Sequence, residues 1–331
     1  MAAISKRYFL FRTAQSLVMI WLAVTVLFFM FRFMPGDFTD VMIFRGADPD
    51  TVEAFRKEWG LDDPLYVQYW RYVTNLMQGD AGTSLQFRQP VFEYVRMGIF
   101  NSFILVAPAI TTAYLLGSLY GLLAGTNRGS LLERQGIVPI LAMGATPSFF
   151  LAMCMVLVFG TWLGWVPTSG LISTETRNLY ADAPWWRIYL TVDFLRHYAL
   201  PFAAITLRYL YLPSLIMRTS VVEVQGQAFS YFQRLTGLPK AKLLRNIAKH
   251  SSLPVVTLYP VSMTRAIGGL VLIEIVFNWP GIGYSLVQAV LGRDYPVLMF
   301  VFFLIAVFII LSNYLVDVLY GVIDPRVSVG E

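Results

Sequence analysis

The chain has 331 residues, of which 57% are hydrophobic and only 14% are charged. Soluble globular proteins are about 45–50% apolar and about 25% charged, so this composition excludes a soluble domain and indicates a polytopic membrane protein. The net charge of +5 does not indicate nucleic-acid binding, because membrane proteins collect positive charge on their cytoplasmic side. The one cysteine, Cys154, cannot form an internal disulfide.

Residues 9–31 form an apolar run that is long enough to cross a bilayer as a helix. Lys6 and Arg7 precede this run, as in a signal peptide, but the run is too long and no small-residue cleavage site follows it. We therefore expect residues 1–34 to hold a retained first transmembrane helix whose N-terminus is cytoplasmic.

Residues 35–97 are polar and acidic, which predicts an extracytoplasmic subdomain after the first helix. A short helix is expected between Asp50, as its N-cap, and Gly60, where it ends. A second helix over 64–77 places apolar residues on one face, which favours a position along the outer membrane surface.

Five further transmembrane segments are predicted in a core that spans residues 98–331. They cover residues 100–126, 137–163, 198–217, 253–277 and 297–322. Pro147 predicts a kink in the second of these segments. Residues 165–197 form an outer loop and residues 218–252 an inner one. The fold class is therefore all-α with about six transmembrane helices.

The distribution of charge orients this layout. The segments assigned to the inside hold twelve Lys or Arg against four acidic residues, and those assigned to the outside hold eleven against fourteen. Positive residues near span ends stay in the cytoplasm, so both termini and the 218–252 loop are expected there.

Motifs of enzyme chemistry are missing from the sequence. It contains no Gly-x-x-x-x-Gly-Lys-Ser/Thr phosphate loop, no hydrolase nucleophile elbow and no cluster with metal-ligand spacing. The two histidines, His197 and His250, are expected on opposite sides of the membrane. We therefore predict no catalytic, cofactor-binding or metal site, which leaves transport, channel or signalling functions.

Arg208, Arg265, Glu274 and Asp317 are predicted to lie inside the membrane, where ionisable groups are costly and mark functional sites. Arg265 and Glu274 are nine residues apart, so they point about 180° away from each other on an unbroken helix. Both are candidates for a translocation path or gate. The alternatives are a bond from Arg265 to a neighbouring helix and a structural contact between Glu274 and the turn at 277–281.

The 218–252 loop holds six Lys or Arg and one acidic residue, Glu223. Pro239 suits the first position of a helix, on which apolar residues such as Ile247 form an edge among bases. Such a basic amphipathic segment can dock on a protein or rest on anionic lipid, and composition alone leaves the two equal.

Short segments in a fixed order along nearly the whole chain resemble the transmembrane permease of peptide-type ABC importers, the dipeptide, oligopeptide and nickel branch, with the B-type subunit most similar. The segments are Arg32-Phe-Met-Pro-Gly-Asp37, Gly60-Leu-Asp-Asp-Pro64, Gln68-Tyr69, Gly79-Asp-Ala-Gly-Thr-Ser84, Pro147-Ser-Phe149, Leu163-Gly-Trp-Val-Pro-Thr-Ser-Gly170, His197-Tyr-Ala-Leu-Pro201, Met217-Arg-Thr-Ser220, Glu223-Val224, Glu274-Ile-Val-Phe-Asn-Trp-Pro-Gly-Ile-Gly283, Arg293-Asp-Tyr-Pro296, Asp317-Val-Leu-Tyr320 and Asp324-Pro-Arg326.

The resemblance implies that the 218–252 loop is a coupling loop that docks on an ATPase subunit. Gly237 matches the glycine of the family's Glu-Ala-Ala-x-x-x-Gly pattern, but Tyr231, Phe232 and Gln233 stand in place of Glu-Ala-Ala. This departure predicts docking against a cognate ATPase with a matching hollow. The residues expected to couple are Phe229, Phe232, Gln233, Arg234, Gly237 and Leu238.

The resemblance also implies a type I importer permease in the plasma (inner) membrane that forms half of a pore for peptides or peptide-like solutes. Its expected partners are a second homologous permease, two ABC ATPases that carry the ATP and Mg, an extracytoplasmic solute-binding protein and membrane lipid, with no nucleic acid. Two alternatives are a self-contained secondary transporter or channel, which would show inverted repeats, and a membrane receptor that does not transport.

Overall fold

The computed structural model describes the chain except for residues 1–5, 34–38, 40–41, 44–45 and 324–331. Two parts of the segments that resemble the family, residues 34–37 and 324–326, lie outside the described residues. The regular structure in the described part is helical, with one isolated bridge between Thr83 and Pro90. Contacts divide the chain into two compact units, which are Met1–Asn101 with Gly281–Glu331, and Ser102–Pro280.

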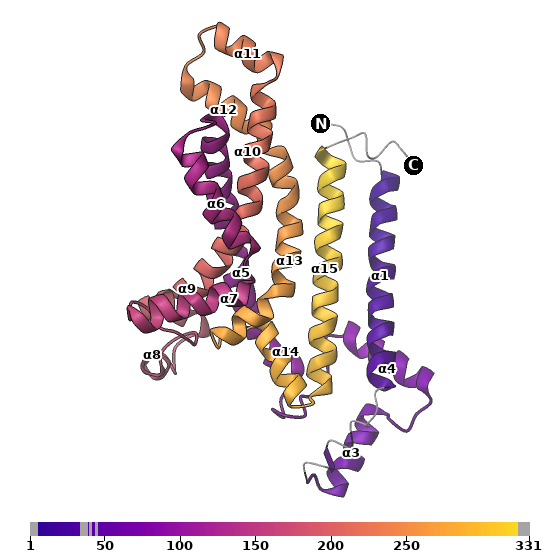
Figure 1. Ribbon diagram of the computed structural model, residues 1–331. Helices are drawn as coiled ribbons and strands as arrows, with labels where there is room; N and C mark the ends of the chain where they lie inside the picture. Colours follow the sequence, from indigo (N-terminus) through magenta and orange to yellow (C-terminus); the bar gives the residue numbers. More distant parts are fainter. Residues whose placement is uncertain (1–5, 34–38, 40–41, 44–45, 324–331) are drawn as a thin grey trace. The chain divides into compact units, whose positions relative to one another are not determined.

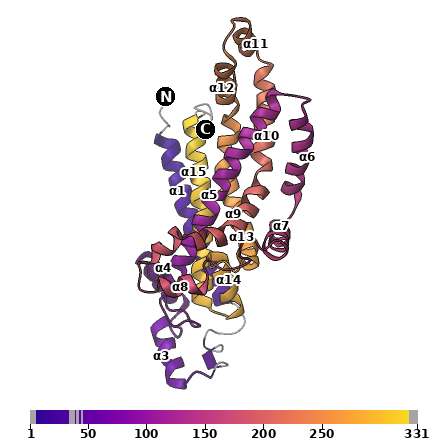
Figure 2. The same ribbon diagram turned by 90° about the vertical axis from the view of Figure 1, so that its left-hand side faces the viewer.

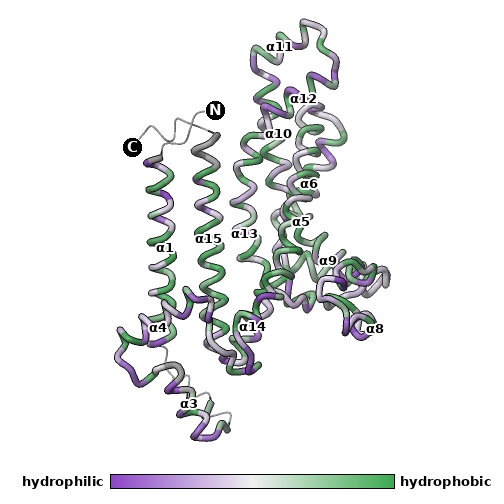
Figure 3. Tube along the Cα trace, turned by 180° about the vertical axis from the view of Figure 1, so that it is seen from behind, coloured by the Kyte–Doolittle hydropathy of each residue, from purple (hydrophilic) through white to green (hydrophobic). Residues whose placement is uncertain are grey.

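Within the described residues, five helices are long and apolar enough to cross a membrane, and a bent helix pair would make a sixth span. The five cover Arg7–Arg32, Val91–Thr126, Val192–Gln225, Leu253–Val276 and Tyr295–Val318. Hydrophobic residues dominate α1, α13 and α15 in Figure 3, whereas hydrophilic stretches mark α3, α11 and α12. The prediction of an all-α membrane protein with about six spans is confirmed by the length and composition of these helices.

In the first unit, α1 (Lys6–Arg32) packs along α15 (Tyr295–Ile323). Arg12 forms an ion pair with Asp317 at 3.4 Å, and the hydroxyls of Thr13 and Tyr314 are 3.0 Å apart. Asp317, which the sequence places in the membrane without a visible partner, is thus neutralised by a residue on the first helix.

The segment after α1 carries α3 (Pro49–Trp59) and α4 (Leu65–Met77). Gly60 ends α3 in the left-handed conformation, as expected, with φ +57°. The prediction of Asp50 as N-cap is wrong by two residues, because Asp48 holds that position. Pro49 favours the first helical position, since its fixed φ suits a helix and its missing N–H would be unpaired there.

The same unit contains α14 (Ile282–Leu291) and the first turns of α5 (Val91–Thr126). Its core gathers buried residues from α1, α5, α14 and α15. The buried carboxylate of Asp294, just before α15, accepts hydrogen bonds from the Ser84 hydroxyl at 2.5 Å and from the Gln86 N–H at 3.0 Å. These bonds fix the 84–86 turn to the start of α15.

The second unit contains the rest of α5, followed by α6 (Leu131–Ala145), α7 (Ser148–Met155) and the π-helical turn η1 (Val156–Trp162). The pair of helices on either side of Pro147 bends by 110°. The sequence predicts a kink here, but the change of direction is that of a broken span or a re-entrant loop. Pro147 disfavours helical conformation at Thr146, and Thr146 is extended, with ψ 134°.

After α8 (Thr174–Leu179) and η2 (Trp185–Leu190), the second unit continues through α9 (Val192–Tyr209) and α10 (Tyr211–Gln225). The short helices α11 (Ala228–Leu235) and α12 (Lys240–Ser251) follow, and α13 (Leu253–Val276) ends the unit. Figures 1 and 2 both place α11 beyond the end of α10, and α12 beside the last turns of α10.

Candidate functional site

The helices α11 and α12 form a hairpin at the tip of the second unit, within the loop that the sequence singles out. Pro239 is the N-cap of α12, and the helix begins at Lys240, one residue later than expected. Both helices are short and amphipathic, so each buries one face against the hairpin or against α10 and leaves the other face open.

One side of α11 packs inward on α12. The rings of Phe229 and His250 lie 4.9 Å apart, and the Asn246 amide donates to the Gln233 side chain at 3.4 Å. Ser230, which follows Phe229 on α11, is fully buried. Of the residues expected to couple, Phe229 and Gln233 therefore hold the hairpin together.

The other side of α11 exposes three large apolar residues. Tyr231, Phe232 and Leu235 are 65%, 69% and 65% exposed. They lie on a hairpin whose surroundings are basic, and an apolar patch rimmed by polar residues marks an interaction site. Phe232 is thus the expected coupling residue that is free to contact a partner, while the side chain of Arg234 lies outside the described residues.

Gly237 ends α11 in the left-handed conformation, with φ +70°. The Leu238 N–H donates to the Gln233 carbonyl at 3.3 Å, across the glycine, which is the pattern of a glycine-terminated helix. A Cβ built on Gly237 would meet nothing within 4 Å. Within this chain the glycine is therefore required for backbone conformation, not for close approach.

An ion pair joins α10, the helix that leads to the hairpin, to α6. The Arg218 guanidinium on α10 donates from both Nε, at 2.7 Å, and Nη2 to Oε1 of Glu133. The other carboxylate oxygen accepts from the Gly129 N–H at 2.6 Å, and Ser130 caps the helix by accepting from the Glu133 N–H. The spacing of Ser130 and Glu133 is a capping-box pattern from which the start of α6 could have been predicted.

Arg265 and Glu274, the two candidates for a path or gate, have different surroundings in the structure. They lie on the single helix α13, as expected, and do not pair: Arg265 is exposed, whereas Glu274 is fully buried. The Ser102 hydroxyl on α5 donates to the Glu274 carboxylate at 2.5 Å. The backbone carbonyl of Glu274 accepts from the Trp279 N–H at 2.8 Å, so Glu274 also contacts the turn at 277–281.

A ridge of small residues on α5 was not singled out from the sequence. A Cβ on Gly117, Gly121 or Gly125 would come within 2.4–2.8 Å of backbone or side-chain atoms of α10 and the residue before it. These three glycines form a repeated Gly-x-x-x-Gly pattern, which lets two helices approach closely in a membrane. The pattern is visible in the sequence and would have predicted this contact.

Among the described residues, no group of three or more His, Cys, Asp or Glu could hold a metal ion. Two of the acidic groups in the second unit instead join helices, since Glu133 bonds to Arg218 and Glu274 to Ser102. The features that stand out are the hairpin with its exposed apolar face and the charged residues on the spans.

Comparison with known proteins agrees with this arrangement. Residues 117–329 match the family described as binding-protein-dependent transport system inner membrane component, and residues 6–97 match its N-terminal region. The glutathione transport system permease protein GsiC of Salmonella paratyphi A is 32% identical over 92% of this chain and 94% of its own length. A putative peptide permease protein of Brucella suis biovar 1 is 34% identical over 98% and 99%.

These matches cover almost the whole chain, including the α11–α12 hairpin and the spans that carry the charged residues. They leave no support for the alternatives of a self-contained transporter or a receptor. The family is one of non-catalytic membrane components without cofactors of their own, which work with the other parts of an ABC transport complex. The chain therefore belongs to the family of binding-protein-dependent transport system inner membrane components, as a multi-pass permease subunit of an ABC importer.

Proposed function

We propose that this chain forms one half of a solute pore, which a second homologous permease completes. Both termini and the 218–252 coupling loop face the cytoplasm, and the 35–97 subdomain and the 165–197 loop face outward to receive cargo from a solute-binding protein. The six transmembrane helices comprise the first helix, in residues 1–34, and five in the permease core at 98–331. The excess of positive charge on the segments assigned to the inside supports this orientation.

Two ABC ATPases bind ATP with Mg and drive this pore through the α11–α12 hairpin. The observation that carries the proposal is the exposed face of Tyr231, Phe232 and Leu235, on a basic hairpin beyond the span ends. Phe232, Arg234 and Leu238 contact the ATPase, while Phe229, Gln233 and Gly237 hold the hairpin in shape. Movement of the ATPases is transmitted as a rigid-body motion of the helices that switches access to the cavity.

The cargo is a peptide or a peptide-like solute. The support is that relatives with 31–34% identity over more than nine-tenths of this chain are named as glutathione or peptide permeases. Arg265, exposed on α13, lines the path. Glu274, buried against α5, belongs to the gate, where it holds two spans together and does not touch cargo.

The test separates docking on a protein from contact with anionic lipid. Phe232→Ser removes apolar surface and leaves the charge unchanged, whereas Lys249→Gln removes an exposed charge from the same hairpin. Aromatic residues central to an interface contribute about 2 kcal/mol or more, a loss of about 30-fold in affinity. We expect Phe232→Ser to reduce recovery of the ATPases with the tagged permease, and ATP-dependent uptake, by at least 10-fold, and Lys249→Gln to reduce neither by more than about 2-fold.

If both variants retain their ATPases, the hairpin is not the docking site. If Lys249→Gln is the more damaging change, contact with anionic lipid explains the hairpin better, and the proposal for Phe232 fails.

A further inference from the structure

Two arginines of the second unit lie half way along candidate spans, and no carboxylate among the described residues pairs with either. Arg208 is near the end of α9, in the middle of the span Val192–Gln225, and Arg265 is in the middle of α13. Two acids of the same unit bond elsewhere, since Glu274 on α13 accepts from Ser102 and Glu133 at the start of α6 accepts from Arg218. Uncompensated cations at this depth are costly and face a wet cavity or a partner.

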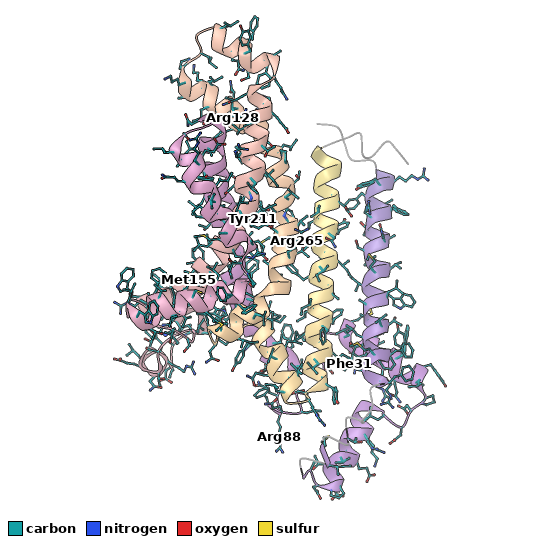
Figure 4. All side chains as sticks on the ribbon, in the orientation of Figure 1. Phe31, Arg88, Arg128, Met155, Tyr211 and Arg265 are labelled. Atoms are coloured by element: carbon teal, nitrogen blue, oxygen red, sulfur yellow. The ribbon has the colours of Figure 1, made fainter. Side chains whose placement is uncertain are left out.

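The two guanidinium groups converge on a cluster of tyrosines. The Arg208 guanidinium lies over the ring of Tyr211, 5.5 Å from its centre, and 5.7 Å from that of Tyr209. Arg265 follows Ser262 by about one turn of α13, and the Ser262 hydroxyl lies 2.6 Å from that of Tyr114 on α5. Helix α13 also packs on α9 and α10, which carry Arg208, Tyr209 and Tyr211. Figure 4 shows Tyr211 and Arg265 at the same level of the second unit.

The hydroxyls of this cluster divide into two groups. Tyr114 hydrogen-bonds to Ser262 at 2.6 Å, and Tyr259 to Thr111 at 2.8 Å, so these hydroxyls hold α5 and α13 together. The hydroxyls of Tyr209 and Tyr211 make no hydrogen bond within the described part of the chain. These two hydroxyls and the guanidinium groups of Arg208 and Arg265 are therefore hydrogen-bond donors that have no acceptor among the described residues. Of the two arginines, Arg265 is exposed.

We propose that Arg208 and Arg265, with the hydroxyls of Tyr209 and Tyr211, bind the carboxylate of cargo during its passage, namely the C-terminal carboxylate of a peptide. This inference rests on the proposed function, which supplies peptides as cargo. The planar fork of a guanidinium matches a carboxylate with two parallel hydrogen bonds. The rings beneath Arg208 orient it by cation–π contact, and leave its N–H groups free to donate.

The depth of the site favours cargo over the phosphate of a lipid headgroup. Arg265 is twelve residues into α13, which at 1.5 Å per residue places it about 18 Å from the start of the helix. Lipid phosphates lie at the membrane surface, whereas a carboxylate that crosses between two half-pores passes this level.

Direct binding tests the site without the solute-binding protein, which selects cargo first. The intact importer, purified in detergent with its partner permease and ATPases, is equilibrated by dialysis with radiolabelled trialanine. We expect saturable binding that weakens at least 10-fold in Arg265→Gln and in Arg208→Gln. N-acetyl-trialanine, which keeps the carboxylate, should compete, and trialanine amide should not.

Arg128→Gln is the matched control, because it removes an exposed positive charge at the α5–α6 turn, away from the cluster (Figure 4). Arg265→Lys and Tyr211→Phe provide milder changes if the glutamine variants fail to assemble. Lysine keeps the charge without the fork, so we expect binding weakened about 3-fold or more.

Three results would overturn the site: no saturable binding to the wild-type importer, equal binding to Arg265→Gln, or equal competition by the amide. ATP-dependent uptake of trialanine by the complete system distinguishes the two proposals. Uptake without binding in the dialysis rejects only the carboxylate site, whereas a wild-type system that takes up no peptide rejects the proposed cargo.

Discussion

Charged side chains on the spans differ in how they are neutralised. Asp317 pairs with Arg12, and Glu133 with Arg218, each across two helices. Arg208 and Arg265 have aromatic neighbours but no carboxylate partner among the described residues. Each of the first two pairs joins two helices, and the Glu133 carboxylate, which is 11% exposed, depends most on its partner. The two arginines are the charges that we propose meet the cargo.

The pair of Arg218 and Glu133 gives a prediction at this scale. We expect Arg218→Gln to lower the midpoint of thermal unfolding of the permease, because it leaves a carboxylate that is mostly enclosed and has lost its charged partner. Arg218→Lys should lower it less, since lysine keeps the charge but donates from a single point.

A double-mutant cycle with Glu133→Gln checks this prediction. The double variant should lose less free energy of unfolding than the sum of the losses in the two single variants. Strict additivity would mean that the two side chains do not stabilise each other in the folded permease.

At the scale of elements, the close contact of α5 with α10 depends on the three glycines of α5. A Cβ on Gly121 would lie 2.4 Å from the carbonyl oxygen of Ser214. Since this atom belongs to a backbone, the helices must separate to admit a side chain. We expect Gly121→Val to destabilise the permease by about 1–3 kcal/mol, the usual cost of overpacking.

Thermal unfolding in detergent, or the yield of assembled complex, measures this effect. Gly268→Ala on α13 is the control, because a Cβ there meets nothing within 4 Å. If Gly121→Val and Gly268→Ala unfold alike, the close approach of α5 and α10 does not matter for stability.

The hairpin gives a second prediction at this scale, about the reason for Gly237. A side chain other than Gly or Asn in the left-handed region costs roughly 1–2 kcal/mol, and the space beside Gly237 is open within this chain. We expect Gly237→Val to reduce ATP-dependent uptake at least 5-fold and to leave ATP hydrolysis uncoupled, and Gly237→Asn to keep at least half of the uptake.

Equal loss in both variants would mean that a partner needs the space beside Gly237, as in a close contact. Equal retention would mean that the end of α11 has no part in coupling. Uptake and ATPase rates measured on the same preparations distinguish these cases.

The sequence predicts the elements better than their contacts. Apolar length was enough to predict the spans in 9–31 and 253–277, because a bilayer sets a fixed requirement. The 110° bend at Pro147 could not be predicted in size, since proline breaks a helix but tertiary packing sets the new direction. The partner of Asp317 could not be predicted either, because Arg12 lies on a helix at the other end of the chain.

For the candidate site, the sequence predicted a basic loop with a helix from Pro239, and the resemblance singled out Gly237 as a coupling residue, which stays a prediction. The pairing of α11 with α12 as a hairpin was not predicted. The structure adds which face of α11 is exposed and why Gly237 is a glycine. The grouping of Arg208 with Arg265 was not predicted, because these residues are 57 positions apart and only the packing of α13 on α9 and α10 brings their helices together.

At the scale of the whole molecule, the proposed mechanism requires one orientation. The chain belongs to a family of permeases without catalytic parts, so the energy for transport must reach it at a surface. The α11–α12 hairpin has to face the compartment that contains ATP, and the segments at 35–97 and 165–197 have to face the opposite side.

Labelling of single cysteines in sealed vesicles tests this orientation most directly. With Cys154 changed to Ser, Thr236→Cys at the exposed end of α11 and Thr174→Cys in the 165–197 loop report on the two sides. We predict that a membrane-impermeant maleimide labels Thr236→Cys only in inside-out vesicles, with protection when the ATPases are co-expressed, and Thr174→Cys only in right-side-out vesicles. Labelling of Thr236→Cys in right-side-out vesicles would contradict the account.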